Sequence, residues 1–301
     1  MLQKTILRAV GVVTVLIVAT YIQILDHDWQ TFGRNAVALR LNERYDTNDP
    51  DAVLDVYYPS EVENTERTLP TVVWVHGGSF ISGSKDQIAN YLRALAAKNY
   101  TVVGVNYSLA PAKIYPTPIL QVNAALAFLS KNGAGLHVDA SKFFLAGDSA
   151  GAQIAGQLAN VLSNSFYAKQ MGVTPSIDRW QLRGVILHCG VFYVVSKGPE
   201  IRSYLGKDFM NESRLEEFSV VRNITVDFPP IFISVGNADP LESQSRLLAD
   251  TATNLGISVD TLFFPSSHRP PLPHEYQFNL DSEAGQLALE RTVRFLAGQS
   301  Q

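Results

Sequence analysis

The pentapeptide G-D-S-A-G at residues 147–151 restricts the fold of this chain more than any other feature. It follows an apolar run at residues 143–146 and precedes a segment with helical spacing of apolar residues. A strand, a serine between two glycines and then a helix predict a nucleophile elbow, in which a sharp turn strains the backbone of Ser149. Gly147 and Gly151 are expected because a Cβ would collide with neighbouring backbone. The alternative is an ordinary turn whose serine caps the helix.

A second glycine-rich turn, H-G-G-S-F at residues 76–80, follows a β-branched run at residues 71–75 that suits a central strand. A serine nucleophile needs backbone N–H donors aimed at the oxyanion of its tetrahedral intermediate. The alternative is a structural turn between a strand and a helix. The candidate donors are the N–H groups of Gly77, Gly78, Ser79 and Ala150.

A serine hydroxyl also needs a histidine to accept its proton and a carboxylate to orient that histidine. Asp239 follows an apolar strand at its carboxyl end, where open α/β sheets place functional side chains, although it could simply cap the next helix. Two histidines follow the last predicted strand. We favour His274, which precedes the C-terminal helix, over His268, which lies beside Arg269 in a proline-rich stretch.

Strand-like and helix-like segments alternate along the chain, which predicts a mostly parallel sheet with helices on both faces. The expected strands lie at residues 53–58, 71–75, 101–106, 142–146, 184–188, 230–235 and 259–264. The expected helices lie at residues 87–98, 118–129, 150–162, 244–255 and 283–296. The polar stretch 42–55 could pair at the sheet edge.

Residues 31–301 are predicted to form one catalytic domain. Within it, an aromatic-rich insertion at about residues 190–228 does not follow the alternation of strands and helices. We expect this insertion to fold over the carboxyl edge of the sheet as a cap and to supply part of an apolar acyl pocket. The alternative is a surface excursion that does not touch the substrate.

The first 30 residues contain a nearly uninterrupted apolar run at residues 9–25. Counted from Thr5 it spans about 20 residues, enough to cross a bilayer. Lys4 and Arg8 precede it, which predicts a signal anchor with a cytoplasmic N-terminus and the catalytic domain on the non-cytoplasmic side of the membrane. The alternative is a cleaved signal peptide and a secreted protein.

The formal net charge of −4 gives no electrostatic reason to expect nucleic acid as a partner. A single cysteine excludes an intramolecular disulfide.

The ordered motifs resemble those of the hormone-sensitive-lipase-like carboxylesterases, which have the α/β-hydrolase fold. H-G-G-S at residues 76–79 is similar to the family's H-G-G-G, and Y-S-L-A-P-A at 107–112 to its Y-R-L-A-P-E. G-D-S-A-G-A at 147–152 is similar to G-D-S-A-G-G, and D-P-L at 239–241 matches the acid motif. The departures are Ser79, Ala152 and H-E-Y at residues 274–276, where the family has H-G-F.

The resemblance implies a serine carboxylic-ester hydrolase that cleaves small to medium acyl esters through an acyl-enzyme. It implies Ser149, Asp239 and His274 as the triad and requires no metal or organic cofactor. The alternatives are an amidase, deacetylase or peptidase with the same triad, or a non-catalytic small-molecule-binding protein on the hydrolase scaffold.

Overall fold

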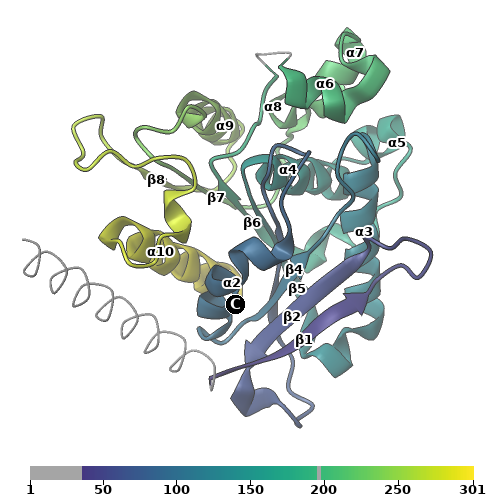
Figure 1. Cartoon of the computed structure of the whole chain (residues 1–301), viewed down its shortest axis with the longest axis vertical. Helices are drawn as coiled ribbons and strands as arrows, with labels where there is room; N and C mark the ends of the chain where they lie inside the picture. The colour runs from purple at the N-terminus through teal and green to yellow at the C-terminus, as the bar shows by residue number, and fades with distance from the viewer. Residues whose placement is uncertain (1–35, 195–197) are drawn as a thin grey trace, which may run out of the picture.

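The computed structural model describes residues 36–194 and 198–301, and its centre is one eight-stranded sheet with the order β1-β2-β4-β3-β5-β6-β7-β8 (Figure 1). The edge strands β1 (Val37–Arg44) and β2 (Val53–Pro59) pair antiparallel, and β2 also runs antiparallel to β4 (Thr101–Val105). All other neighbours are parallel. They are β3 (Leu69–Val75), β5 (Val138–Asp148), β6 (Leu182–His188), β7 (Ile231–Val235) and β8 (Val259–Phe263).

Helices cover both faces of the sheet, because successive side chains of a strand point to opposite faces and both faces are apolar. On one face, α2 (Ala89–Ala96) and α10 (Glu283–Gln299) pack in a cluster that includes Trp74. The other face carries α3 (Thr117–Asn132), α4 (Ser149–Ser163) and α9 (Glu242–Asn254), whose apolar side chains pack with Val73 and Val75. Each fully buried large apolar side chain contributes about 1.5 to 3 kcal/mol of transfer free energy.

The register of the central strands brings the two predicted site turns together. Val75, the last residue of β3, pairs with Gly147 of β5. The loop after Val75 and the turn after Asp148 therefore start side by side at the carboxyl edge of the sheet. This is the edge at which open α/β sheets place their sites.

The predicted fold class is confirmed: the structure is an α/β-hydrolase fold with a mostly parallel sheet flanked by helices. The stretch 42–55 does pair at the sheet edge, Glu43 with Leu54 and Arg44 with Val53, but the edge strand begins earlier in the chain. The edge strand is Val37–Arg44, and residues 45–52 form the turn that leads into β2. Most side chains of β1 are half-buried or exposed, so the strand lacks a clear apolar alternation. The short helix α5 (Ser165–Met171) was not predicted.

The described residues between β6 and β7 include the short α-helices α6 (Pro199–Leu205), α7 (Glu212–Phe218) and α8 (Val220–Asn223). Figure 1 shows α6 and α7 at the upper edge of the molecule, beyond α4. The ring of Tyr204 in α6 stacks on Phe80 with centroids 4.1 Å apart, and Phe218 of α7 meets Phe80 edge to face. This segment therefore packs directly on the loop that follows β3.

The expected membrane localisation is corrected. Across both described ranges, no helix combines the length and the apolar character needed to cross a bilayer. The apolar run at residues 9–25, from which a single-pass anchor was predicted, lies outside the described residues.

Candidate active site

Ser149 occupies the bend between β5 and α4 with a φ of 51°, in the left-handed region that is strained for a residue with a side chain. Both flanking glycines are required by space. A Cβ on Gly147 would lie 2.5 Å from the carbonyl carbon and oxygen of Gly151, and one on Gly151 would lie 2.0 Å from the carbonyl oxygen of Val75. The bend thus has the geometry that was expected of a nucleophile elbow.

The structure brings the other two predicted residues to this serine. Nε2 of His274 lies 3.0 Å from Oγ of Ser149, and Nδ1 of His274 lies 2.8 Å from Oδ2 of Asp239. The other oxygen of Asp239 accepts the backbone N–H of Leu241 at 2.7 Å. His268, the alternative base, instead packs its ring on Phe264 with centroids 4.7 Å apart.

The electrostatic surroundings favour the charged form of His274. Burial lowers the pKa of the imidazole, but the hydrogen bond to Asp239 and the negative charges of Asp239, Glu275 and Asp148 outweigh burial, so its pKa is raised. The Asp239 side chain itself is fully buried. A buried carboxylate that accepts from Nδ1 fixes the tautomer in which Nε2 can take a proton from Ser149.

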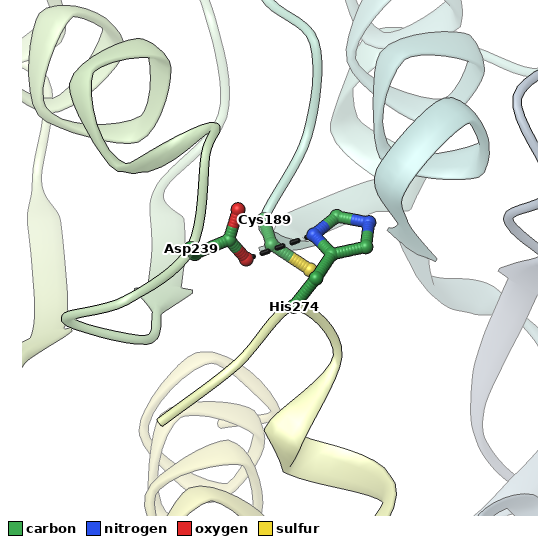
Figure 2. Close-up of side chains that lie close together, drawn as sticks. All are labelled: Cys189, Asp239 and His274. Carbon is green, nitrogen blue, oxygen red and sulfur yellow. Dashed lines mark hydrogen bonds and ion pairs between the residues drawn. The ribbon is translucent and has the colours of Figure 1, made fainter. Parts of the chain in front are cut away.

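Cys189, at the end of β6, lies against this pair (Figure 2). Among the histidine, cysteine, aspartate and glutamate side chains of the described ranges, one group of three is close enough to share a metal ion. It consists of Cys189, Asp239 and His274, whose ligand atoms lie within 4.8 Å of one another. However, Asp239 and His274 are already hydrogen-bonded to each other. Burial raises the pKa of the Cys189 thiol. Cys189 is thus a neutral packing partner of the pair.

The loop after β3 turns sharply through three residues with left-handed backbone. The φ angles are 113° at Gly78, 55° at Ser79 and 67° at Phe80. The carbonyl oxygen of Gly78 accepts the N–H groups of Ile81 and Ser82, which closes the turn. Ser79 therefore keeps the conformation for which a glycine is usually selected, and it still carries a backbone N–H.

One of the predicted oxyanion donors is already engaged. The N–H of Gly77 donates to Oδ2 of Asp148 at 2.7 Å. The other oxygen of Asp148 accepts from Nε1 of Trp74 at 2.8 Å. Asp148 therefore anchors the loop to the elbow, and the remaining candidates are Gly78, Ser79 and Ala150.

Tyr107, which supports this loop, was not identified from the sequence as a supporting residue. The hydroxyl of Tyr107 donates to the carbonyl oxygen of His76 at 3.0 Å, and the two rings stack with centroids 4.3 Å apart. Burial lowers the pKa of His76 to about 4, so the imidazole is neutral and structural. The tyrosine in the motif at residues 107–112 was the available signal, but the sequence did not reveal its partner.

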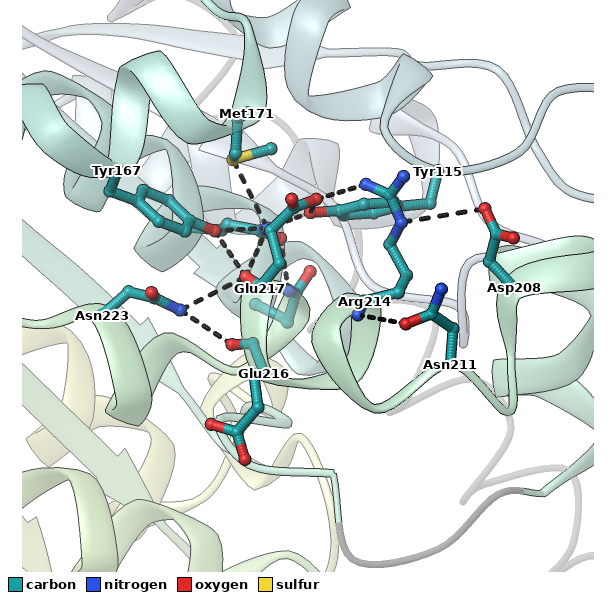
Figure 3. Close-up of polar contacts among 11 residues, drawn as sticks. Tyr115, Tyr167, Met171, Asp208, Asn211, Arg214, Glu216, Glu217 and Asn223 are labelled. Atoms are coloured by element: carbon teal, nitrogen blue, oxygen red, sulfur yellow. Dashed lines mark hydrogen bonds and ion pairs between the residues drawn. The ribbon is translucent and has the colours of Figure 1, made fainter.

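A buried polar network joins α7 to the body of the protein (Figure 3). The carboxylate of Glu217 accepts from the hydroxyl of Tyr115 at 2.8 Å and pairs with the guanidinium of Arg214. Gln157 of α4 donates to the hydroxyl of Tyr115 at 2.6 Å. Glu217 thus connects the segment between β6 and β7 with the helix that carries Ser149.

An elbow serine hydrogen-bonded to a histidine–aspartate pair, beside a glycine-rich loop on this sheet, defines a serine hydrolase of the α/β-hydrolase fold. The family model described as BD-FAE matches residues 54–251. The carboxylesterase NlhH of Mycobacterium tuberculosis is 30% identical over 255 residues, which cover 79% of this chain and 76% of that protein.

Solved structures of esterases share the fold. Esterase B from Lactobacillus rhamnosis superposes with a TM-score of 0.75 at 26% identity and covers 94% of both chains. A bacterial heroin esterase superposes with a TM-score of 0.69 at 20% identity over 93% of this chain and 90% of that chain, which shows the common fold. The chain belongs to the BD-FAE family and, within the α/β-hydrolase superfamily, to the hormone-sensitive-lipase-like carboxylesterases; it is a serine carboxylic-ester hydrolase.

Proposed function

We propose that Ser149, His274 and Asp239 are the catalytic triad of this esterase and that it cleaves small to medium acyl esters through an acyl-enzyme. The continuous hydrogen-bond chain from Ser149 through His274 to the buried Asp239 is the observation that carries the assignment. Its order along the sequence, serine, acid and then histidine, is that of α/β-hydrolases.

In the first half of the reaction, Oγ of Ser149 attacks the acyl carbonyl carbon while Nε2 of His274 accepts the hydroxyl proton. The imidazolium that forms is stabilised by Asp239 at Nδ1 and then gives its proton to the leaving alcohol. In the second half, His274 deprotonates a water molecule that attacks the acyl-enzyme, and Ser149 recovers its proton from His274 as the carboxylic acid leaves.

The tetrahedral intermediates carry a negative oxygen, which we place against backbone N–H groups of Gly78, Ser79 and Ala150. The N–H of Gly77 is left out of this set because it already donates to Asp148 and cannot donate equally to the oxyanion. Donors preorganised by the strained turn at Gly78 to Phe80 need no rearrangement when the charge develops.

Residues 31–301 form the catalytic domain in this proposal, with a cap at about residues 190–228. The contacts of Tyr204 and Phe218 with Phe80 support a cap that borders the oxyanion loop. These rings fill space beside the loop and limit the acyl chain that can lie there. Rates on p-nitrophenyl esters of increasing acyl length should therefore fall beyond a medium chain, and a rate that rises steadily with chain length would refute the size limit.

Substitution of the nucleophile tests the proposal. Ser149→Ala should lower kcat on a p-nitrophenyl ester by on the order of 10⁴- to 10⁶-fold in a folded protein. Ser163→Ala, at the far end of the same helix, is the matched control and should keep its activity. His274→Ala should be nearly inactive, whereas His268→Ala should turn over normally; the reverse would overturn the choice of base.

Labelling by a fluorophosphonate separates the enzyme from a non-catalytic binding protein. The native protein should become covalently labelled at Ser149, and Ser149→Ala should not. A native protein that stays unlabelled and inactive on every ester tested would exclude the proposed triad.

A further inference from the structure

Glu275, the residue after His274, has a φ of 59°, in the left-handed region that disfavours a side chain. Its backbone N–H faces the thiol of Cys189 and lowers the pKa of that thiol against the larger effect of burial. Strained residues of this kind concentrate at functional sites.

The carboxyl group of Glu275 lies between the base and the oxyanion loop. Its Oε1 is 3.7 Å from Nε2 of His274, the nitrogen that faces Ser149. The same carboxyl group lies close enough to Asp148 for its charge to raise the pKa of the Asp148 carboxyl group. Gly77 is in contact with both groups, because a Cβ there would lie 2.4 Å from Oδ2 of Asp148 and 2.9 Å from Oε1 of Glu275.

Two carboxylates in contact repel each other, and both cannot remain ionised when one of them is buried. Asp148 is fully buried, and burial together with the charge of Glu275 raises its pKa to about 7. A proton on Asp148 removes the repulsion. The negative charge beside Nε2 of His274 is then that of Glu275.

We propose that Glu275 is a positioning residue for the triad, whose carboxylate, beside the buried carboxyl group of Asp148, stabilises the His274 imidazolium from its Nε2 side. Asp239 acts on Nδ1, so the ring lies between two carboxylates. The inference rests on the proposed role of His274 as the base. Glu275 is then, after Asp239, a second source of negative charge that acts on the His274 ring during acylation and deacylation.

The consequence is a shift in the pH dependence of kcat/KM. Negative charge beside the imidazolium favours the protonated base, so the acid limb lies at higher pH than it would without Glu275. The other groups that face this cluster are uncharged at neutral pH: Cys189, Tyr91, Tyr107 and His76 are buried, and burial favours the neutral form of each. The acidic groups that face His274 are Asp239, Glu275 and Asp148.

Glu275→Gln keeps the shape and hydrogen-bonding capacity of the side chain but removes its charge. The apparent pKa of the acid limb of kcat/KM should fall by about 0.5 to 1, and the plateau should change by less than about tenfold. Asp148→Asn/Glu275→Gln removes the charge of the whole pair and should lower that pKa further. Glu290→Gln makes the same charge change on the exposed face of α10 and should leave the limb in place.

Glu275→Gly guards against a misfolded variant, since glycine adopts a φ of 59° without strain. It should show the same displacement of the limb. Fluorophosphonate labelling of Ser149 is measured in each variant. The inference is overturned if the acid limb of kcat/KM stays in place in both Glu275 variants while these variants are labelled at Ser149 and hydrolyse the ester. The proposed triad would remain intact in that case. An unlabelled native protein would instead exclude the triad.

Discussion

Gly151 packs its Cα directly against the carbonyl oxygen of Val75, because a Cβ on Gly151 would lie only 2.0 Å from that oxygen. This contact joins the first turn of α4 to the end of β3. The serine at the bend and the loop that follows Val75 are therefore held together by backbone packing. The proposed triad and the proposed oxyanion loop therefore share one junction.

Gly151→Ala should lower the free energy of unfolding by about 1 to 3 kcal/mol, because the backbone around Val75 has to move to admit a methyl group. Activity should fall with it, since the same movement displaces the loop after β3. Urea denaturation and kcat/KM measure the two effects. Gly298→Ala, whose Cβ would meet nothing within 4 Å, is the control and should be neutral or slightly stabilising.

The pH dependence of kcat/KM should show an acid limb above pH 6.5, the ordinary pKa of histidine. Burial lowers the pKa of His274, but Asp239 and the neighbouring carboxylates raise it more, and only the neutral imidazole can accept the serine proton. Activity is therefore lost as the pH falls through this raised pKa. A limb at or below 6.5 would contradict the arrangement.

Asp239→Asn tests how much Asp239 contributes to the raised pKa of His274. The variant loses the hydrogen bond and the charge that raise the pKa of His274, so the acid limb should move to lower pH. The variant also no longer fixes the tautomer of His274 in which Nε2 can take the proton of Ser149, so kcat should fall about 10⁴-fold. Unchanged kcat in the folded variant would exclude Asp239 as the acid.

Much of the fold and the triad could be predicted because their signals are local. Buried parallel strands such as β3 are continuous apolar runs, and the elbow needs two glycines around Ser149 within five residues. The acid and the base follow their strands in a fixed order. His274 was preferred to His268, and the structure places His274 at the serine.

The remaining features depend on contacts between distant residues, which leave no local pattern. Nε1 of Trp74 reaches Asp148 across 74 positions, and Asp148 in turn engages the N–H of Gly77. That N–H looked equivalent to its neighbours in the sequence. Glu275 stood out only as a departure from glycine, and its approach to Asp148 required the fold.

A buried ion pair beside the sheet edge should be important for stability. Nζ of Lys85 lies 3.0 Å from Oδ2 of Asp55, and the side chains are only 3% and 2% exposed. Lys85→Met leaves a buried carboxylate without its cation and should cost about 3 to 5 kcal/mol of unfolding free energy. Asp55→Asn/Lys85→Met should recover part of that loss in urea denaturation, since the stranded charge is removed.

The exposed pair of Arg67 and Glu61 provides the comparison, with side chains 50% and 69% exposed. Glu61→Gln should change the free energy of unfolding by less than about 1 kcal/mol. If Lys85→Met and Glu61→Gln change the free energy of unfolding equally, burial does not make the Lys85–Asp55 pair more important for stability than the exposed pair.

The cap should loosen when the charge network of α7 is broken. Glu217 is 10% exposed, and its carboxylate pairs with Arg214 and the hydroxyl of Tyr115. Arg214→Met removes the cation and should cost about 1 to 3 kcal/mol. Because Phe218 packs on Phe80 beside the oxyanion loop, KM should rise more than kcat falls.

Hydrogen exchange measures this loosening directly, and Arg214→Met should speed exchange in α6 and α7 while β3 and β5 stay protected. Glu216→Gln is the matched control, since its partner Arg222 is 50% exposed and Glu216 is 55% exposed. If Arg214→Met and Glu216→Gln show the same hydrogen exchange and the same KM, the buried pair of Glu217 and Arg214 does not hold α6 and α7 in place. If Arg214→Met alone opens it, the buried carboxylate holds the cap against the loop that receives the ester.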